Sequence, residues 1–376
     1  MKKQKLLACL TALCMTATAF APIAQPVQAQ TDVETAEASS TLNVIPKSSE
    51  YTMNEGTFTL GADAEIAVIA EDDGAAAELT NTGEYIAEVF RVSTGYELPV
   101  VEKTEPVNGD ITLRLNPDGG YAEQAYAIDV TTDQVIIEAG APVGIFYGVQ
   151  TLRQMLPADI ESEELVSGTA WTIPCAQIAD EPEYGLRSMM LDVTRHFFTV
   201  DQVKRQLDML SQYKVNTLHM HMSDDQGWRL EIKGEMYGES LDKLRTIGAQ
   251  TSCNTNGINP GQYTQEEFKE IVAYANERYI QIIPEFDMPS HACAALVSLS
   301  FLNSTEDGRP PANGYDNTRP YEGWDVGFNS LECRKERPGH RALDRVTKMA
   351  AIWEIGHAGF GGIRQAERRK LVCPAF

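Results

Sequence analysis

Hydrophobic and polar residues follow one pattern up to about residue 182 and a different one after it. In the first part, short runs rich in β-branched and apolar residues predict strands at 65–70, 110–115, 125–130 and 134–139. Longer runs with apolar residues three and four apart predict helices at 75–92 and 143–156. This mixture predicts an α+β domain with an antiparallel sheet. No catalytic cluster is evident in it, so we interpret it as a supporting domain.

After residue 182, strand patterns alternate with helical ones. Strands are predicted at 188–193, 215–222 and 279–284, with a helix between each pair. The helices begin at Thr199 and Thr264, each followed three residues later by a Gln or Glu that completes a capping box. Alternating strands and helices predict parallel βαβ units, in which chemistry lies at the carboxyl ends of the strands. Polar residues stand at these ends: Asp192, Arg195, Asp224, Asp225, Glu285, Asp287 and His291.

The first 40 residues are typical of a targeting segment and a linker. Lys2, Lys3 and Lys5 precede an apolar run over 6–20 and a small-residue cleavage site at 27–29. We therefore predict a signal peptide at 1–29, an exported protein and a polar linker at 30–40; a buried N-terminal helix is the alternative. The apolar run is shorter than the roughly 20 residues of a membrane-spanning helix, and no later segment approaches that length, so no membrane span is expected.

Charge argues against two classes of partner and separates the end of the chain from the rest. The sequence has 31 basic and 54 acidic residues, a net charge of −23, which disfavours nucleic acid and anionic membranes as partners. Residues 1–332 carry a net −29, whereas 333–376 carry +6 and lose the strand–helix pattern. We interpret 333–376 as a discordant tail from a shifted reading frame or a misplaced gene end. A natural basic tail is the alternative.

Four sequence blocks resemble those of one enzyme family. The run GIFYGVQTLRQ at 144–154 resembles the signature of the non-catalytic domain that precedes family 20 glycoside hydrolase barrels. RSMMLDVTRHFF at 187–198, KVNTLHMHMSDDQGWR at 214–229 and PEFDMPSH at 284–291 are similar to barrel blocks of bacterial β-N-acetylhexosaminidases, in the same order and spacing. The resemblance covers about 41–331.

The resemblance implies a fold and an activity. It implies an α+β non-catalytic domain at 41–182, followed by an incomplete (β/α)8 TIM-type barrel at 183–332. It also implies exo-acting hydrolysis of terminal N-acetylglucosamine or N-acetylgalactosamine, from β-linked glycans or chitin fragments. The family mechanism is retaining and substrate-assisted: the 2-acetamido oxygen attacks the anomeric carbon while a glutamic acid protonates the leaving oxygen. No cofactor or metal is expected.

The same resemblance assigns roles to individual residues. Asp224 and His291 resemble the supporting pair that couples to the general acid, since an Asp–His hydrogen bond fixes the imidazole tautomer. Arg187 resembles the arginine that binds sugar hydroxyls, with a salt bridge as the alternative. Asp287 is expected to orient His291 or to line the pocket. Trp228 is a candidate for sugar stacking, with a place in the core as the alternative.

The family's general acid is missing from the place where it is expected. A Gly-Gly-Asp-Glu block should fall near 360–365, but residues 361–364 read Gly-Gly-Ile-Arg. Asp180-Glu181 matches the family's linker, not the catalytic pair. A smaller departure is Ser290, where the family has glycine, whose conformational freedom the backbone near His291 could need. We therefore expect this chain to be inactive. Because an unclosed barrel exposes apolar surface, we also expect the chain to aggregate, to be degraded, or to keep only its N-terminal domain folded.

Two other functions remain open. The chain could be a non-catalytic, carbohydrate-binding remnant that keeps sugar affinity. Alternatively, His219 and His221, which alternate along one predicted strand, could begin the site of a metal-dependent hydrolase. The further ligands of such a site are not evident, so hydrogen-bonded packing is the preferred interpretation of these histidines.

Overall fold

The computed structural model describes residues 41–253, 261–288, 290–302 and 319–324. The predicted signal peptide, linker and discordant tail, and residues 361–364, lie outside these ranges. The described residues contain two hydrophobic cores, one built from residues between 42 and 178 and the other from residues between 193 and 302.

The first core lies against a seven-stranded sheet with the strand order β1-β7-β5-β6-β4-β2-β3. Four of its strands confirm predicted ones, with starts shifted by one residue. The strands are β1 (Glu50–Thr59), β2 (Ile66–Ile69), β3 (Val100–Glu102), β4 (Ile111–Leu115), β5 (Tyr126–Val130), β6 (Val135–Ala139) and β7 (Thr172–Asp180). Side chains along β5 and β6 alternate between buried and half-buried, so one face of the sheet supplies the core.

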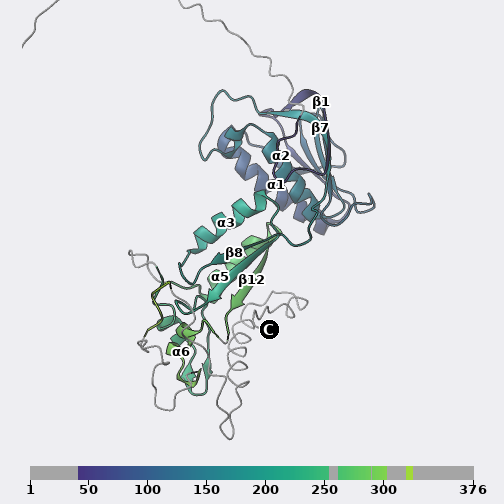
Figure 1. Cartoon of the computed structure of the whole chain (residues 1–376). Helices are drawn as coiled ribbons and strands as arrows, with labels where there is room; N and C mark the ends of the chain where they lie inside the picture. Colours follow the sequence, from purple (N-terminus) through teal and green to yellow (C-terminus); the bar gives the residue numbers. More distant parts are fainter. Residues whose placement is uncertain (1–40, 254–260, 289, 303–318, 325–376) are drawn as a thin grey trace, which may run out of the picture. The chain divides into compact units, whose positions relative to one another are not determined.

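Two helices cover this sheet, and both were predicted from the sequence. They are α1 (Asp73–Thr94) and α2 (Pro142–Met155), and Figure 1 shows them on the same side of the sheet. Asp72 caps the start of α1 by accepting a hydrogen bond from the Ala75 N–H, and Gly95 ends it in the left-handed conformation. Helix α2 is buried along most of its length, and Gly148 packs against β6, where an added Cβ would lie 2.5 Å from Ile137.

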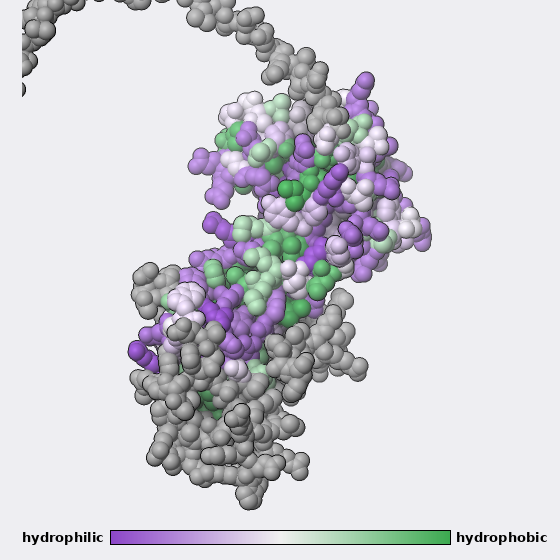
Figure 2. Space-filling model, in the orientation of Figure 1, coloured by the Kyte–Doolittle hydropathy of each residue, from purple (hydrophilic) through white to green (hydrophobic). Residues whose placement is uncertain are grey.

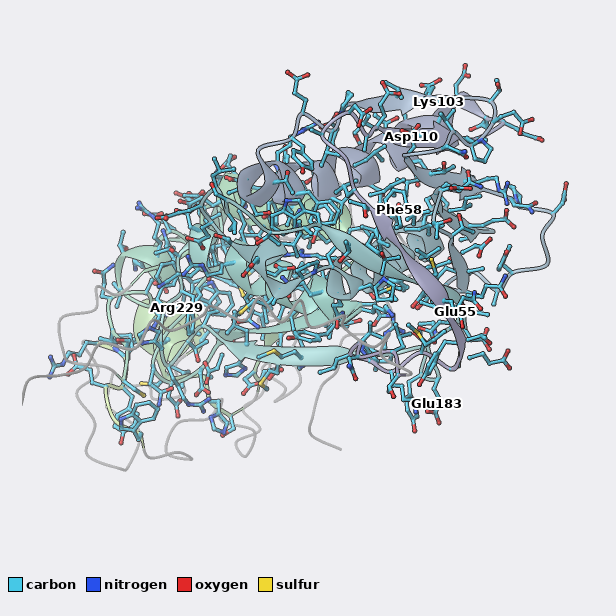
Figure 3. The ribbon with its side chains drawn as sticks, turned by 90° about the horizontal axis from the view of Figure 1, so that it is seen from above. Glu55, Phe58, Lys103, Asp110, Glu183 and Arg229 are labelled. Carbon is cyan, nitrogen blue, oxygen red and sulfur yellow. The ribbon has the colours of Figure 1, made fainter. Side chains whose placement is uncertain are left out.

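The expectation of a purely antiparallel sheet is wrong, because the sheet is mixed. Strand β2 pairs in parallel with β3 and β4, and β4 pairs in parallel with β6, whereas β5, β7 and β1 pair antiparallel. The reason is the connection: α1 joins β2 to β3 as a crossover helix, and such a crossover returns the chain in the same direction. Next to these parallel strands, Lys103, which follows β3, forms a salt bridge of 2.6 Å with Asp110, which precedes β4 (Figure 3).

The second core is built on the predicted parallel βαβ units. Strands β8 (Ser188–Asp192), β9 (Thr217–Ser223) and β12 (Gln281–Phe286) pair in parallel in the order β12-β9-β8, with α3 (Val200–Gln212) and α5 (Gln265–Asn276) as the connecting helices. Strands adjacent in sequence are adjacent in space, as at the start of a TIM-type barrel. The described residues do not form a closed barrel.

The two βαβ units repeat the same local structure. Both helices begin with the predicted capping boxes, at Thr199 and Thr264. Both are followed by a residue in the left-handed conformation, Lys214 with φ 58° and Tyr279 with φ 55°. The next residue in each case, such as Val215, donates its N–H back to the last turn. These ends reverse the chain sharply enough for the next strand to begin within two residues, at Thr217 and at Gln281.

Shorter elements lie in the connections of both parts. These are η1 (Ala158–Glu161) in the first part, and β10 (Glu235–Met236), β11 (Glu239–Ser240), α4 (Lys243–Thr246), α6 (Cys293–Ser298) and η2 (Ser300–Leu302) in the second. None of the helices in the described ranges is long and apolar enough to cross a membrane.

Strand β8 forms an edge of the three-stranded sheet and presents apolar side chains to solvent. Met189 is 40% exposed and Met190 54% exposed. Figure 2 shows hydrophobic side chains at the surface over the region where Figure 1 draws β8 and β12. An apolar strand edge of this kind promotes association.

We expect Met190→Thr to reduce self-association of the purified chain, because threonine keeps strand propensity and removes apolar surface. Light scattering coupled to size exclusion measures the change as a lower mean mass. Met209→Gln on α3, where Met209 is also exposed, is the matched control and should leave the mass distribution unchanged. Equal effects of the two variants would contradict a role for the strand edge.

Candidate active site

Charged side chains meet at the carboxyl ends of β8, β9 and β12. Asp192 is the last residue of β8, and Glu285 lies near the end of β12. His221 lies near the end of β9, and Asp224 is the first residue after that strand. His291 follows β12 by a few residues. Parallel pairing brings these strand ends to one edge of the sheet, which is why residues almost 100 positions apart become neighbours.

Asp224 is the centre of this cluster. Its carboxylate accepts hydrogen bonds from His291 Nδ1 on Oδ1 at 2.9 Å, and from His221 Nε2 and Arg195 Nη2 on Oδ2 at 2.9 and 2.6 Å. The Asp225 N–H adds a further bond to Oδ1 at 2.5 Å. Burial opposes ionisation, but the bonds from His221 and Asp225 and the nearby arginine hold the pKa of Asp224 below its usual range. Asp224 is therefore a carboxylate with a fixed orientation.

His221 joins Asp224 to Glu285 and carries a positive charge. Its Nδ1 lies 3.0 Å from Glu285 Oε1, and its ring is buried. Burial alone would lower its pKa, but the hydrogen bonds to Asp224 and Glu285 raise the pKa to about 10. Both ring nitrogens consequently donate at neutral pH. His219 also contacts Glu285 through Nε2. The preferred interpretation of these two histidines, hydrogen-bonded packing, agrees with this geometry.

Glu285 and Asp287 are held in opposite protonation states. The hydrogen bond from His221 keeps the pKa of Glu285 well below its usual value. Burial, and then the neighbouring Glu285, raise the pKa of Asp287, so Asp287 retains a proton at a higher pH than an ordinary aspartic acid. The backbone N–H of Asp287 donates to Ser223 Oγ at 3.0 Å. Separated protonation states of this kind are characteristic of functional sites.

The structure brings together three of the five residues singled out from the sequence. Asp224 and His291 are hydrogen-bonded as expected, and Asp287 lies beside them. In the described residues, however, the hydrogen bond that orients His291 is donated by its Nδ1 to Asp224, not to Asp287. A left-handed φ of 54° falls at His291 itself, a conformation that non-glycine residues rarely adopt.

Arg187 and Trp228 lie outside the cluster. Arg187 precedes β8, at the opposite end from Asp192, and its guanidinium donates to Lys214 O, Tyr184 O, Gln124 Oε1 and Tyr147 Oη. Four of the five N–H groups of its guanidinium are thus engaged by protein acceptors. Trp228 is completely buried and donates from Nε1 to Leu230 O, so it belongs to the core, the alternative that the sequence left open.

The sequence placed Arg195 and Glu285 at the strand ends and His221 in a metal site or in packing, but it assigned none of the three a role in the hydrolase site. All three lie close to the carboxyl ends of predicted strands, and this position was the feature of the sequence that could have identified them as site residues. Arg195 is tied to Asp192 through Nη1 at 2.6 Å and to Asp224 through Nη2, and it remains partly exposed. It is thus the arginine that faces this end of the sheet.

A completely buried arginine supports the loops that carry the cluster. Arg229 (Figure 3) donates hydrogen bonds to five backbone carbonyls, and its cation lies 6.0 Å from the centre of the Phe197 ring. The carbonyls belong to Val193, Thr194, Ala249, Thr251 and Gly261. Arg229 thereby ties the loop after β8, which contains Arg195, to the segments after β9.

Two family models match the chain. "Glycosyl hydrolase family 20, catalytic domain" matches residues 184–329, and "Glycosyl hydrolase family 20, domain 2" matches residues 41–181. The order expected from the sequence, an α+β domain followed by a TIM-type fold, is consistent with the two matches.

Curated relatives and solved structures agree with these models. A β-hexosaminidase of Porphyromonas gingivalis is 35% identical over 266 residues, covering 71% of this chain and 33% of that protein. One of Vibrio furnissii is 33% identical, covering 74% of this chain and 42% of that protein. The family 20 β-N-acetylhexosaminidase of Streptomyces coelicolor A3(2) superposes with a TM-score of 0.67 at 38% identity, covering 82% of this chain and 57% of that one.

The chain thus spans between a third and a half of the length of these two curated relatives. The matches nevertheless run through both of its cores and through the strand ends that carry Asp224 and His291. The chain belongs to glycosyl hydrolase family 20, with matches to both its domain 2 and its catalytic domain.

Proposed function

We propose that the protein in its intact reading frame is an exported, exo-acting β-N-acetylhexosaminidase that removes terminal N-acetylglucosamine or N-acetylgalactosamine by a retaining, substrate-assisted mechanism, and that the chain ending in residues 333–376 has lost turnover. The observation that carries the proposal is the bond from His291 to a fixed, ionised Asp224 at the carboxyl ends of parallel strands. Relatives support it: a solved Streptomyces plicatus hexosaminidase holds N-acetylglucosamine, and a Vibrio harveyi relative is an N,N'-diacetylchitobiase.

In this proposal the residues of the chain bind the sugar and control a proton. Asp224 accepts a hydrogen bond from His291 Nδ1–H. The other ring nitrogen, Nε2, is left to face a general acid. Such a pair brings the pKa of the general acid close to the pH at which the enzyme works. Arg195, held by Asp192 and Asp224, presents its planar cation to sugar hydroxyls in the role expected earlier of Arg187. The acetamido oxygen supplies the nucleophile, so no second protein carboxylate has to attack.

This chain is proposed to bind sugar without turnover, because Ile363 and Arg364 stand where the family's Asp-Glu pair is expected. Loss of a general acid costs typically about 10²–10⁴-fold in rate. We expect no release of 4-nitrophenol from 4-nitrophenyl N-acetyl-β-glucosaminide above the level of an Asp224→Asn variant. Hydrolysis well above that level, and unaffected by a chelator, would contradict the inactive state and keep the family chemistry. Hydrolysis abolished by the chelator would favour the metal-dependent alternative.

The same reasoning predicts how activity returns. Sequencing codons 325–376 and translating the three frames tests whether one of them encodes Gly-Gly-Asp-Glu. A chain restored to that frame should hydrolyse the substrate, and Arg195→Lys should raise KM or lower kcat/KM at least about tenfold, since a lysine cannot make the paired contacts of a guanidinium. Arg187→Lys is the matched control and should affect stability more than kcat/KM. A larger loss of kcat/KM in Arg187→Lys than in Arg195→Lys would assign the sugar-binding role to Arg187.

A further inference from the structure

The face of the seven-stranded sheet opposite α1 and α2 contains a hollow of about 250 Å³. Figure 1 shows both helices on the other side of this sheet. Gln177, Asp129 and Ile136 stand side by side in the floor of the hollow, because the registers of β7 with β5 and of β5 with β6 pair them. The intervening residues, such as Ile128 and Ile137, belong to the core beneath the helices. The floor therefore presents side chains that the first core does not use.

One wall of the hollow is held in place by a network around Glu138. Its Oε2 atom accepts from the Arg114 guanidinium, and its Oε1 atom accepts from Tyr121 Oη at 2.9 Å and from Asn116 Nδ2 at 3.2 Å. The ring of Tyr121 packs against Gly119, where an added Cβ would lie 2.7 Å from Cε2. Arg114 and Tyr121 thus line the hollow in fixed positions, so a ligand does not have to order them.

Other polar groups of the lining are free to bind a ligand. Within the described residues, no hydrogen bond engages the side chains of Asp129 and Gln177, and the Nη1 atom of Arg114 has no partner. Gln177 is exposed and Asp129 is half-buried. Ile136 and Ala127, both half-buried, add apolar surface beside them. The lining thus combines donors, acceptors, an aromatic ring and aliphatic surface within one small hollow.

This combination suits a neutral ligand that is rich in hydroxyl groups. Asp129, Glu138 and the net charge of −23 disfavour an anion. A wholly apolar ligand would remove Asp129 and the free Arg114 N–H group from water without replacing their hydrogen bonds. A sugar hydroxyl can instead donate to the carboxylate and accept from the guanidinium. The C–H face of a pyranose ring covers aliphatic and aromatic side chains such as Ile136 and Tyr121.

We propose that the hollow binds one pyranose unit of a neutral glycan. Asp129 and Gln177 bond its hydroxyls, Arg114 donates to a further oxygen, and Tyr121 and Ile136 pack against its ring. The site lies in the first part of the chain and shares no residue with the cluster at the strand ends. It therefore goes beyond the proposed function and gives the first part a role besides support.

Affinity electrophoresis of the full chain, in native gels with glycol chitin or with hydroxyethyl cellulose, tests the site. Arg195→Ala is introduced first, so that sugar affinity at the strand ends does not contribute to retention. In this background Asp129→Ala and Gln177→Ala should each raise the dissociation constant at least about fivefold, because each removes a hydrogen bond to the ligand. Asp133→Ala is the matched control: it removes the same charge from an exposed turn after β5 and should leave retention unchanged.

Thermal unfolding followed by circular dichroism confirms that each variant is folded like its parent. Retention that is lost in Arg195→Ala but kept in Asp129→Ala alone would overturn the proposal and leave the strand ends as the sugar site. Retention in neither gel would contradict sugar binding at both places. A lower mean mass of Asp129→Ala in light scattering, with retention unchanged, would show that this face joins two copies of the chain and would also overturn the proposal.

Discussion

Replacing Arg229 with methionine is expected to prevent stable folding of the second core. The variant keeps the volume of the side chain but removes all donors to five buried carbonyls. Leaving even one buried polar group unsatisfied costs about 1–3 kcal/mol. The loss of donors to the whole set should therefore cost more than about 3 kcal/mol, a large share of the stability of a typical domain.

Urea unfolding followed by tryptophan fluorescence measures the effect, because Trp228 is buried in the second core and Trp171 in the first. Arg229→Lys should fall between the wild type and Arg229→Met, since one ammonium cannot reach carbonyls on both sides of a planar fork. Arg245→Met removes an exposed arginine paired with Asp242 and should leave the midpoint unchanged. If Arg229→Met unfolded at the wild-type urea concentration, the carbonyls would have other donors and the supporting role would fail.

Replacing Lys214 with methionine should cause the second largest loss of stability. Lys214 Nζ is buried, 2.7 Å from Tyr126 Oη and 3.3 Å from Asp180 Oδ2, and the tyrosine hydroxyl donates to the same carboxylate oxygen at 2.6 Å. Burial lowers the pKa of Lys214 and raises that of Tyr126, so the group is desolvated. Removing one partner of a buried ion pair leaves an uncompensated charge and typically costs about 3–5 kcal/mol.

The matched control is Lys204→Met, which removes a surface pair with Glu270 of the kind usually worth about 0–1 kcal/mol. Both variants exchange lysine for methionine within or just after α3, so helix propensity contributes little to the difference. The double variant Lys214→Met/Asp180→Asn should recover part of the loss, because it also removes the unpaired carboxylate. A Lys214→Met chain no less stable than Lys204→Met would show that the buried pair has no net effect.

The second part of the fold was largely predictable because its signals are local. Capping boxes at Thr199 and Thr264 determine where the two helices begin, and the alternating pattern indicates the parallel units. The mixed sheet was less predictable. Strands β1 and β7 are separated by more than 100 residues in the sequence. Only their contact in the folded structure shows that they run antiparallel. No local pattern contains that information.

The candidate site also has features that the sequence predicts and features that only the tertiary structure shows. The sequence by itself determined the family resemblance, the supporting pair Asp224 and His291, and the strand ends where chemistry gathers. Only the tertiary structure decided that Arg195 and not Arg187 faces this end of the sheet, that Trp228 belongs to the core, and that His221 carries a charge between two carboxylates. The reason is physical: a residue's type and its place on a strand are local properties, but its burial, charge and partners depend on groups that distant segments bring beside it.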